Sequence, residues 1–441
     1  MTSRDLADKI CRTLHDAGHQ AFLVGGCVRD LELGREPLDY DVSTDAHPPR
    51  VQQLFPDSLA IGAQFGVVLV FDGSSEVEVA TFRSDIGYSD GRHPDSVVFT
   101  SSAREDVTRR DFTINGLLLD PLTGEVFDYV GGRADLRARL IRAIGDAEAR
   151  FREDKLRMVR AVRFSARFDF AIEPATLAAI KKLAPEITVV SAERLRDELT
   201  KILTEGAARR GFELLDETGL LREILPEVSR MKGVEQPPQF HPEGDVWIHT
   251  LLILGMLPAG VSPTLAWGAL LHDVGKPPTF TPPSGPDGRI RFDHHVEVGT
   301  TIAGVIARRL RFTNEETEQV AALVANHLRF KDVPQMRSST LKRFVRLPNF
   351  EEHLELHRMD CLSSHRNLEN YEFVRRFLSE TPPDEVRPAR LVTGDDLKAM
   401  GLNPGPAFKE ILRNVEDAQL EGRVRNREDA LELIRAEFLK G

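Results

Sequence analysis

The sequence predicts an α+β protein in which a mixed β-sheet head is followed by all-helical domains. Short apolar runs, broken by Gly, Pro and Asp-Gly turns, are typical of strands and occur up to about residue 145. Beyond that point the apolar residues recur with helical spacing and the strand signals vanish. At 441 residues the chain is long enough for about three domains with a large core.

In the head, predicted strands alternate with helical pieces. Leu6, Ile10 and Leu14 share one helical face, which predicts a helix over residues 4–17 that ends at Gly18. A mixture of short strands and helices indicates an α+β head over residues 1–145. The predicted strands cover 20–24, 39–43, 67–71 and 76–82, and a further helix covers 47–54.

The rest of the chain divides at a Pro- and Gly-rich stretch. Residues 146–232 are predicted to form a helical neck and body, and 233–244 (GVEQPPQFHPEG) a linker. A second helical block over 245–375 contains most of the histidines. A helical tail over 391–441 completes the predicted organisation.

Composition excludes some classes of function. A net charge of −11 argues against a protein that coats nucleic acid by bulk electrostatics, although a local basic groove remains compatible with it. The three cysteines are widely spaced and odd in number, so neither a disulfide framework nor a cysteine zinc site is indicated, which fits a reducing cytoplasm. No apolar run is long enough to span a membrane. We therefore expect a cytoplasmic protein without a membrane partner.

The first chemical motif runs from Leu23 to Thr44. Gly25 and Gly26 allow backbone N–H groups to approach a phosphate, and Arg29 adds a fork of donors. Asp39 and Asp41 are predicted to share one strand face, where two carboxylates repel each other unless a cation lies between them. Oxygen ligands of this kind suit Mg²⁺. A strand-to-helix turn followed by a solvated edge strand is the structural alternative.

Two further head features bear on this site. Arg109, Arg110, Asp111 and Asn115 suit triphosphate clamping and sugar contacts, whereas an isolated Arg-Arg-Asp would be a salt-bridged surface turn. Glu78 is a third carboxylate that could complete a metal shell or could be an exposed edge-strand residue. The sequence leaves that choice open.

A third motif begins at Glu153. Asp154 and Arg157 are predicted to project from adjacent turns of one helix, with Arg160 and Arg163 following. Intrahelical ion pairs explain this pattern on composition alone. Alternatively, a carboxylate that accepts from an exocyclic amino group and an arginine that donates to a ring nitrogen would recognise the Watson–Crick edge of C or A.

These three motifs together resemble the polymerase-β-like nucleotidyltransferases, in the branch of bacterial CCA-adding tRNA nucleotidyltransferases and poly(A) polymerases. The resemblance implies that Asp39 and Asp41 are catalytic and hold Mg²⁺, and that the EDxxR motif selects CTP and ATP. Gly116 replaces the usual Ala of the RRDxxxNA element, a small-for-small change. The residues implied to bind nucleotide are Gly25, Gly26, Arg29, Arg109, Arg110, Asp111, Asn115, Glu153, Asp154, Arg157, Arg160 and Arg163.

Two other segments match this family. Residues 83–99 are predicted to be a long loop and resemble the flexible loop of members that add the terminal A. The helix that follows Ser191, containing Arg194 and Glu198, resembles the last neck motif and is predicted to support the selecting helix.

The histidine block indicates a second metal centre. An adjacent His272-Asp273 pair at the end of an apolar helix is poorly explained by packing, because both groups are costly to bury unpaired. The order of His and Asp resembles the HD superfamily of metal phosphohydrolases, which implies His249, His272, Asp273 and Asp360 as ligands. His295 and His327 match the extra histidines of two-metal members. The implied metal is a divalent transition metal or Mg²⁺. The HD domains of some CCA-adding enzymes hydrolyse small phosphomonoesters, 2′-nucleotides and 2′,3′-cyclic phosphates, and the sequence leaves open whether this domain is active and on which phosphate.

We therefore expect a tRNA nucleotidyltransferase that adds CCA from CTP and ATP and binds the tRNA acceptor end. An A-adding enzyme or poly(A) polymerase that uses ATP alone shares the same motifs. From another class, the head could be an RNA-binding module attached to an HD phosphohydrolase. Oligomeric state is left open.

Overall fold

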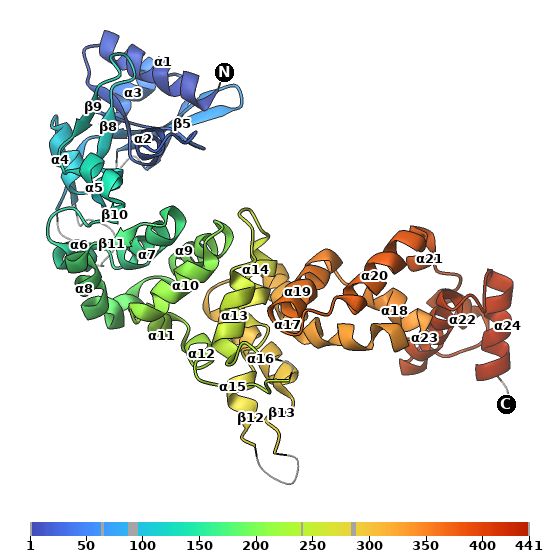
Figure 1. Ribbon diagram of the computed structural model, residues 1–441. Coiled ribbons are helices and arrows are strands. Elements are labelled where there is room, and N and C mark those ends of the chain that lie inside the picture. The colour runs from blue at the N-terminus through green and yellow to red at the C-terminus, as the bar shows by residue number, and fades with distance from the viewer. Residues whose placement is uncertain (1, 63–65, 87–95, 240, 284–287, 440–441) are drawn as a thin grey trace. The chain divides into compact units, whose positions relative to one another are not determined.

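The computed structural model describes residues 2–62, 66–86, 96–239, 241–283 and 288–439. The chain forms two compact units (Figure 1). Unit 1 contains Met1–Ser229 with Leu257–Val261, and unit 2 contains Arg230–Met256 with Ser262–Gly441. The domain limits predicted near 145 and 375 lie inside these units and stay predictions.

A seven-stranded mixed sheet forms the head, which confirms the predicted fold class. The strand order is β3-β4-β5-β2-β1-β8-β9, with β2 and β5 parallel and all other neighbours antiparallel. The strands are β1 (Ala21–Val24), β2 (Asp41–Thr44), β3 (Ser58–Gly62), β4 (Val67–Asp72), β5 (Ser75–Thr81), β8 (Leu117–Leu119) and β9 (Val126–Asp128). Helices of the head are α1 (Ser3–Asp16), α2 (Gly26–Glu32), α3 (Pro48–Leu54), α4 (Ala103–Thr108) and α5 (Gly132–Ala138), and Thr113–Asn115 form a 3₁₀ turn.

Side-chain alternation builds the core of the head. On β5, Val77 and Val79 are buried while Glu76 and Glu78 are exposed, which is the period expected of a strand covered on one face. Helix α1 begins with a capping box in which Thr2 and Asp5 satisfy each other's backbone N–H groups. Its apolar face is buried, as its spacing predicts.

The segment predicted as a loop over 83–99 is strand at both ends. Strands β6 (Arg83–Ile86) and β7 (Ser96–Phe99) pair antiparallel, with Arg83 opposite Phe99. The prediction of a loop across the whole segment was therefore wrong at its ends. Residues 87–95, which carry the resemblance to the family's loop, lie outside the described residues.

Helices make up most of the remainder of unit 1. They are α6 (Ala147–Glu153), α7 (Leu156–Phe168), α8 (Pro174–Leu183), a 3₁₀ stretch Ala184–Val189, α9 (Ala192–Thr204), α10 (Ala208–Glu217), α11 (Leu220–Ile224) and α12 (Pro226–Ser229); the short strands β10 (Leu140–Ile141) and β11 (Ala171–Ile172) pair parallel. Leu156, Val159 and Val162 of α7 are buried, which leaves the arginines of the helix for its other face.

Unit 2 is also helical. Its elements are α13 (Val246–Leu254), α14 (Pro263–Leu271), α15 (Lys276–Thr279), β12 (Phe280–Thr281), β13 (Arg291–Phe292), α16 (His295–Arg309), α17 (Asn314–Asn326), a 3₁₀ stretch His327–Gln335, α18 (Ser338–Phe344), α19 (Phe350–Ser363), α20 (Glu369–Glu380), α21 (Pro383–Val386), α22 (Gly394–Ala399), α23 (Pro406–Leu420) and α24 (Arg427–Phe438). The tail from Val392 to Ile434 has a small apolar core of its own, and the packing of this core stabilises α22, α23 and α24.

The stretch predicted as a linker is hydrogen-bonded to the start of α13. Glu235 and Asp245 form an isolated antiparallel bridge, and the Val246 N–H donates to the Val234 carbonyl at 3.0 Å. These contacts fold the stretch back onto the helix that carries His249. It therefore forms part of unit 2.

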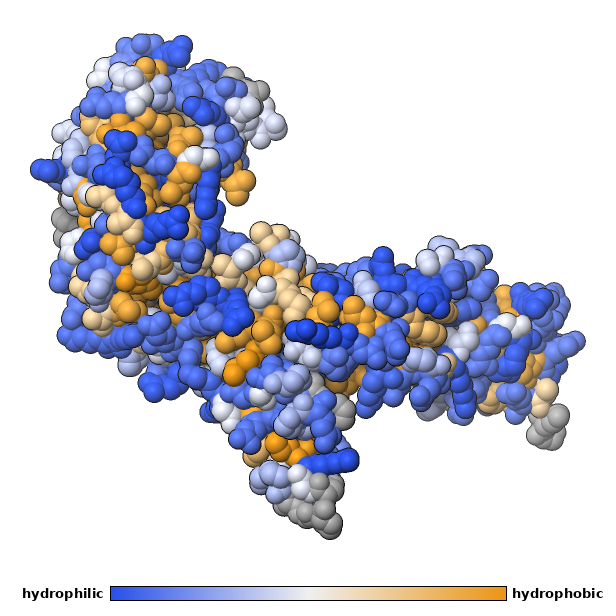
Figure 2. All heavy atoms as spheres, in the orientation of Figure 1, coloured by the Kyte–Doolittle hydropathy of each residue, from blue (hydrophilic) through white to orange (hydrophobic). Residues whose placement is uncertain are grey.

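Most of the surface in Figure 2 is hydrophilic, and its apolar side chains lie in separate groups. Within the described ranges, every helix is too short or too polar to cross a membrane.

Candidate functional site

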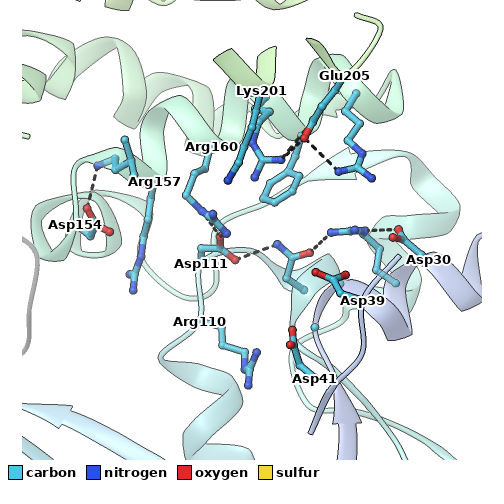
Figure 3. A pocket seen from close by; sticks show the side chains of 18 of the residues that line it. Asp30, Asp39, Asp41, Arg110, Asp111, Asp154, Arg157, Arg160, Lys201 and Glu205 are labelled. Atoms are coloured by element: carbon cyan, nitrogen blue, oxygen red, sulfur yellow. Dashed lines mark hydrogen bonds and ion pairs between the residues drawn. The ribbon is translucent and has the colours of Figure 1, made fainter. Parts of the chain in front are cut away.

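One candidate site lies in unit 1, in a cavity of about 630 Å³. Figure 3 shows Asp39 and Asp41 on one side of it and Asp154 and Arg157 on the other. The cavity is lined by every predicted catalytic and nucleotide-binding residue except Glu153, and also by Asp30, Leu38, Leu156, Phe164, Arg167, Arg194, Lys201 and Glu205. The structure thus brings together three motifs that are up to about 130 positions apart in the chain.

Gly25 is required by the backbone at the start of α2. Its φ of 74° lies in the left-handed region that glycine adopts without strain. A Cβ at this position would also lie 3.3 Å from Nη1 of Arg110. The glycine therefore lets the arginine side chain approach the turn.

Asp39 and Asp41 line the same cavity, but only Asp41 belongs to β2. Asp39 lies in the irregular segment before the strand, so the prediction that a single strand holds both residues was wrong. Burial, together with the charges of Asp39 and Glu78, raises the pKa of Asp41 to about 6. The accumulated negative charge fits a divalent cation bound between these oxygens.

The paired arginines are held by a carboxylate that the sequence reasoning missed. Asp106 on α4 is buried, and it accepts from Arg109 at 2.6 Å and from Arg110 at 2.9 Å, one arginine on each oxygen. Burial opposes the charge of Asp106, but the two guanidinium groups lower its pKa below the usual value. The sequence signal for this contact is the spacing of Asp106, three and four residues before the arginines on a helix.

Asp111 joins the head to the neck. Arg160 on α7 donates to its Oδ2 through Nε at 2.9 Å and Nη2 at 2.7 Å, and Asn115 donates to Oδ1 at 3.1 Å. Arg29 in turn donates to the side-chain oxygen of Asn115 at 2.7 Å. Two arginines that approach the cavity from different elements are thus fixed through one buried network.

The selecting motif does not form one continuous helix. Helix α6 ends at Glu153, Asp154 is extended with φ −145° and ψ 105°, and α7 begins at Leu156. The prediction that Asp154 projects from a helical turn was therefore wrong. Arg157 nevertheless reaches Glu153 at 2.7 Å across the break, as its spacing predicts.

Arg163 has acidic partners on α9 and just after it. Its side chain is 7% exposed and donates to Glu198 at 2.7 Å and to Glu205 at 3.1 Å. Arg194, at the start of the same helix, donates to both oxygens of Asp154, at 3.1 Å and 2.7 Å. Ion pairs thus link α9 to α7 through Arg163 and to the break before α7 through Asp154, while the supporting role of α9 stays a prediction.

Unit 2 holds the predicted histidine cluster. Among the described residues, three groups of side chains each place three ligand atoms within 4.8 Å of one another, and two of these groups consist of predicted ligands. One group is His249, His272 and Asp360; the other is Asp273, His295 and His327. Asp273 also lies 3.2 Å from Nε2 of His272, so it connects the two groups.

The ring nitrogens of the four histidines are arranged for metal binding. In each, Nδ1 lies within hydrogen-bond distance of a group that can only accept: Glu243 for His249, and backbone carbonyls for His272, His295 and His327. Each Nδ1 therefore carries the hydrogen when the ring is neutral, which leaves Nε2 as the free acceptor. Among the described residues, Nε2 of His295 and of His327 is buried without a hydrogen-bond partner. These observations fit two divalent ions with nitrogen and oxygen ligands.

Electrostatics at this centre also favours a cation. Nε2 of His249 lies 3.1 Å from Asp360 and 3.3 Å from Nε2 of His272. Burial opposes protonation of His249, but the hydrogen bonds that its ring donates to Asp360 and Glu243 outweigh this effect and raise its pKa to about 9. A proton or a metal ion is therefore needed between these groups.

The predicted linker supplies residues to this centre that the sequence reasoning missed. Oε1 of Glu243 accepts from Nδ1 of His249 at 2.7 Å and from Nδ1 of His241 at 2.8 Å. Gln236 accepts from Lys276 at 2.6 Å, and the Lys276 ammonium lies 2.7 Å from Asp273. Although His241, Glu243 and His249 are close enough to hold an ion, their contacts are explained by Nδ1 hydrogens donated to one carboxylate.

Comparisons with known proteins agree with this geometry. The Poly A polymerase head domain family matches residues 21–142, the family described as the probable RNA and SrmB-binding site of polymerase A matches 169–232, and the HD domain family matches 248–363. A CCA-adding enzyme from Levilactobacillus brevis is 32% identical over 432 residues, which cover 97% of this chain and 96% of that protein.

Two other similarities differ in extent. A CCA-adding enzyme from Lactobacillus johnsonii is 38% identical over 249 residues, and the match spans 56% of this chain and 62% of that protein. The crystal structure of the Bacillus stearothermophilus CCA-adding enzyme in complex with CTP is 27% identical, with a TM-score of 0.75 and complete coverage of both chains.

Proposed function

The chain belongs to the family of CCA-adding enzymes, and we propose that it adds C and A residues to the 3′ end of tRNA, using CTP and ATP and releasing pyrophosphate. One observation carries the proposal: an acidic pair, Asp39 and Asp41, shares a single cavity with a potential base-reading pair, Asp154 and Arg157. The cavity also contains the donors that a triphosphate requires.

Asp39 and Asp41 would hold Mg²⁺. The metal would supply Lewis-acid stabilisation of the triphosphate and activation of the attacking 3′-hydroxyl. Arg29, Arg109 and Arg110 would bind the phosphates, and Asp106 keeps two of these side chains oriented before the nucleotide arrives. Catalysis then rests on positioning and charge neutralisation, without a covalent enzyme intermediate.

Base selection would rest on the opposite side of the cavity. Asp154 would accept a hydrogen bond from the exocyclic amino group of C or A, and Arg157 would donate to the neighbouring ring nitrogen. Uracil and guanine present a carbonyl and a ring N–H at these positions. Both contacts would then be mismatched.

The decisive test uses tRNA transcripts that lack all three terminal nucleotides or only the terminal A, with labelled CTP or ATP and Mg²⁺. We expect two C residues and then one A on the first transcript, and a single A on the second. Addition of A only, and only to the transcript that ends in CC, would identify an A-adding enzyme. A long A tail would identify a poly(A) polymerase.

The second candidate function is a metal-dependent phosphohydrolase in unit 2. It is supported by the two groups of ligand atoms and by the buried Nε2 atoms without hydrogen-bond partners. We propose a divalent transition metal or Mg²⁺ at this centre and small phosphomonoesters as substrates. Lys276, buried beside Asp273, provides a cation that could neutralise a phosphate oxygen.

This second function is tested by phosphatase assay of the full chain with Ni²⁺, Mn²⁺ or Mg²⁺. His272→Ala should abolish metal-stimulated hydrolysis and leave nucleotide addition intact. Equal hydrolysis by the variant and the wild type would remove the metal centre from the reaction. Hydrolysis without any nucleotide addition by the wild type would support the alternative of an RNA-binding head attached to a phosphohydrolase.

A further inference from the structure

We propose that Arg194 is a specificity-determining positioning residue, which acts through Asp154 to restrict the nucleotides that the cavity accepts. The proposal rests on the function proposed above. Arg194 lies in the first turn of α9, 40 positions from Asp154 in the sequence, and both residues line the cavity. Its guanidinium group places one nitrogen on each carboxylate oxygen, at 3.1 Å and 2.7 Å.

The local backbone explains why Asp154 needs such a partner. Asp154 lies in the extended break between α6 and α7, so helical geometry does not fix its side chain. A carboxylate attached to an irregular segment can rotate about its side-chain torsions. The planar fork of Arg194 fixes the orientation of the carboxylate plane, which a single point charge does not do.

The contacts of Asp154 leave one acceptor position. Its two oxygens offer about four lone-pair positions. Oδ1 accepts from the Leu156 N–H at 3.1 Å and from Arg194, whereas Oδ2 accepts from Arg194 alone among the described residues. One lone pair on Oδ2 therefore remains, which matches one N–H of an exocyclic amino group.

Arg157 shows a complementary arrangement. Its Nη1 donates to Glu153 at 2.7 Å and to the Arg150 carbonyl at 3.2 Å, and its Nη2 donates to the Arg109 carbonyl at 3.1 Å. A guanidinium group has five N–H donors. The Nε hydrogen and one Nη2 hydrogen of Arg157 therefore have no acceptor among the described residues. The pair thus presents a single acceptor beside a donor, which is the complement of the Watson–Crick edge of C and of A.

Selectivity therefore depends on the direction of the one free lone pair. If Asp154 rotates, its second oxygen can move away and Arg157 can donate to a carbonyl, which would admit uracil or guanine. Arg194 prevents this rotation through its two hydrogen bonds to the Asp154 carboxylate. Since α9 is tied to α7 by Glu198 and Arg163 at 2.7 Å, the fork is held on a fixed helix.

The test compares Arg194→Met, Arg194→Lys and wild type in single-nucleotide addition with CTP, ATP, UTP and GTP. We expect the ratio of kcat/KM for CTP over UTP, and for ATP over GTP, to fall about ten-fold or more in both variants, because a bidentate contact is lost. Arg194→Lys keeps the charge but loses the fork, so it should resemble Arg194→Met in selectivity. Arg209→Met on α10, where the arginine is half-exposed, is the matched control and should keep the wild-type ratios.

A purely structural role would lower all four kcat/KM values by a common factor and leave both ratios unchanged. That result would overturn the inference, as would wild-type selectivity in Arg194→Lys. Wild-type protein that incorporates neither CTP nor ATP would instead reject the proposed function. The two failures are therefore distinguishable in one set of assays.

Discussion

Asp41 on β2 and Glu78 on β5 are paired across two parallel strands, so both side chains project from the same face of the sheet. The Asp41 carboxyl group therefore experiences two further negative charges, those of Glu78 and Asp39. Glu78 itself is exposed and does not line the cavity, whereas Asp39 does. Glu78 therefore acts on Asp41 through charge.

Removal of the carboxylate of either Asp39 or Asp41 should strongly reduce nucleotide addition. Asp39→Ala and Asp41→Ala should each lower CTP incorporation by about 10²-fold or more, since each removes a charge that the transition state requires. The measurement is labelled CTP incorporated per minute into a tRNA transcript. Glu76→Gln, an exposed change on β5, is the control. Undiminished incorporation in the Asp41 variant would contradict the proposed site.

Loss of the Asp41 charge should also stabilise the metal-free protein. Its pKa is raised from 3.8 to about 6 on folding, so between these pH values the unfolded state ionises while the folded state holds its proton. Stability therefore falls as the pH rises from about 4 to about 6, and the full loss is present above pH 6. At pH 7.5 the Asp41→Asn variant should therefore be more stable than wild type by about 2 kcal/mol and should unfold at a higher temperature. At pH 4 the two proteins should differ little in stability. Equal melting curves at pH 7.5 in EDTA would refute this.

Glu243 should control metal affinity in unit 2. Its carboxylate accepts from Nδ1 of His249 at 2.7 Å and thereby directs Nε2 towards Asp360 and His272. Glu243→Gln should weaken Mn²⁺ or Ni²⁺ binding about 10- to 100-fold, as expected when a carboxylate that orients a ligating histidine is lost. Calorimetric titration of the full chain measures this. The exposed Glu318→Gln provides the comparison, and equal dissociation constants in both variants would exclude the orienting role.

His353 should make the protein sensitive to mild acid. It is 1% exposed with both ring nitrogens unpartnered among the described residues, and burial lowers its pKa to about 4. Since its pKa is near 6.5 in the unfolded chain, the unfolded state takes up the proton first and stability falls as the pH drops from 6.5 to 4. At pH 5 the loss amounts to about 2 kcal/mol.

His353→Leu tests this acid sensitivity. The drop in melting temperature between pH 7.5 and pH 5 should be smaller in this variant than in wild type. The exposed His365→Leu should leave the drop unchanged. An identical drop in wild type and His353→Leu would show that this histidine does not titrate with unfolding.

The head and its acidic pair could be predicted from sequence because their signals are local. The apolar run of β4, the alternation in β5 and the spacing between Gly26 and Asp39 each occupy a few neighbouring residues. The partnership of Asp154 with Arg194 spans 40 positions, and neither residue alone indicates it. The break at Asp154 was missed because the surrounding residues have good helix propensity, while the Asp154 side chain accepts from the Leu156 backbone and so starts a new helix.

The segment over 233–244 was misjudged for a different reason. Its Pro and Gly content is typical of a flexible connection. Composition does not show that Glu243 lies against His249, because that contact depends on the chain folding back through the bridge between Glu235 and Asp245. A histidine and a glutamate in such a stretch were the available signal.

The contacts of residues 233–244 with α13 determine where a fragment that contains only the phosphohydrolase-like region should begin. The HD family match begins at residue 248, and a gene fragment cut there would lack Gln236, His241 and Glu243. His249 would keep its place on α13 but lose the carboxylate that accepts its Nδ1 hydrogen at 2.7 Å. Cloning should therefore begin no later than Arg230, where the second compact unit starts.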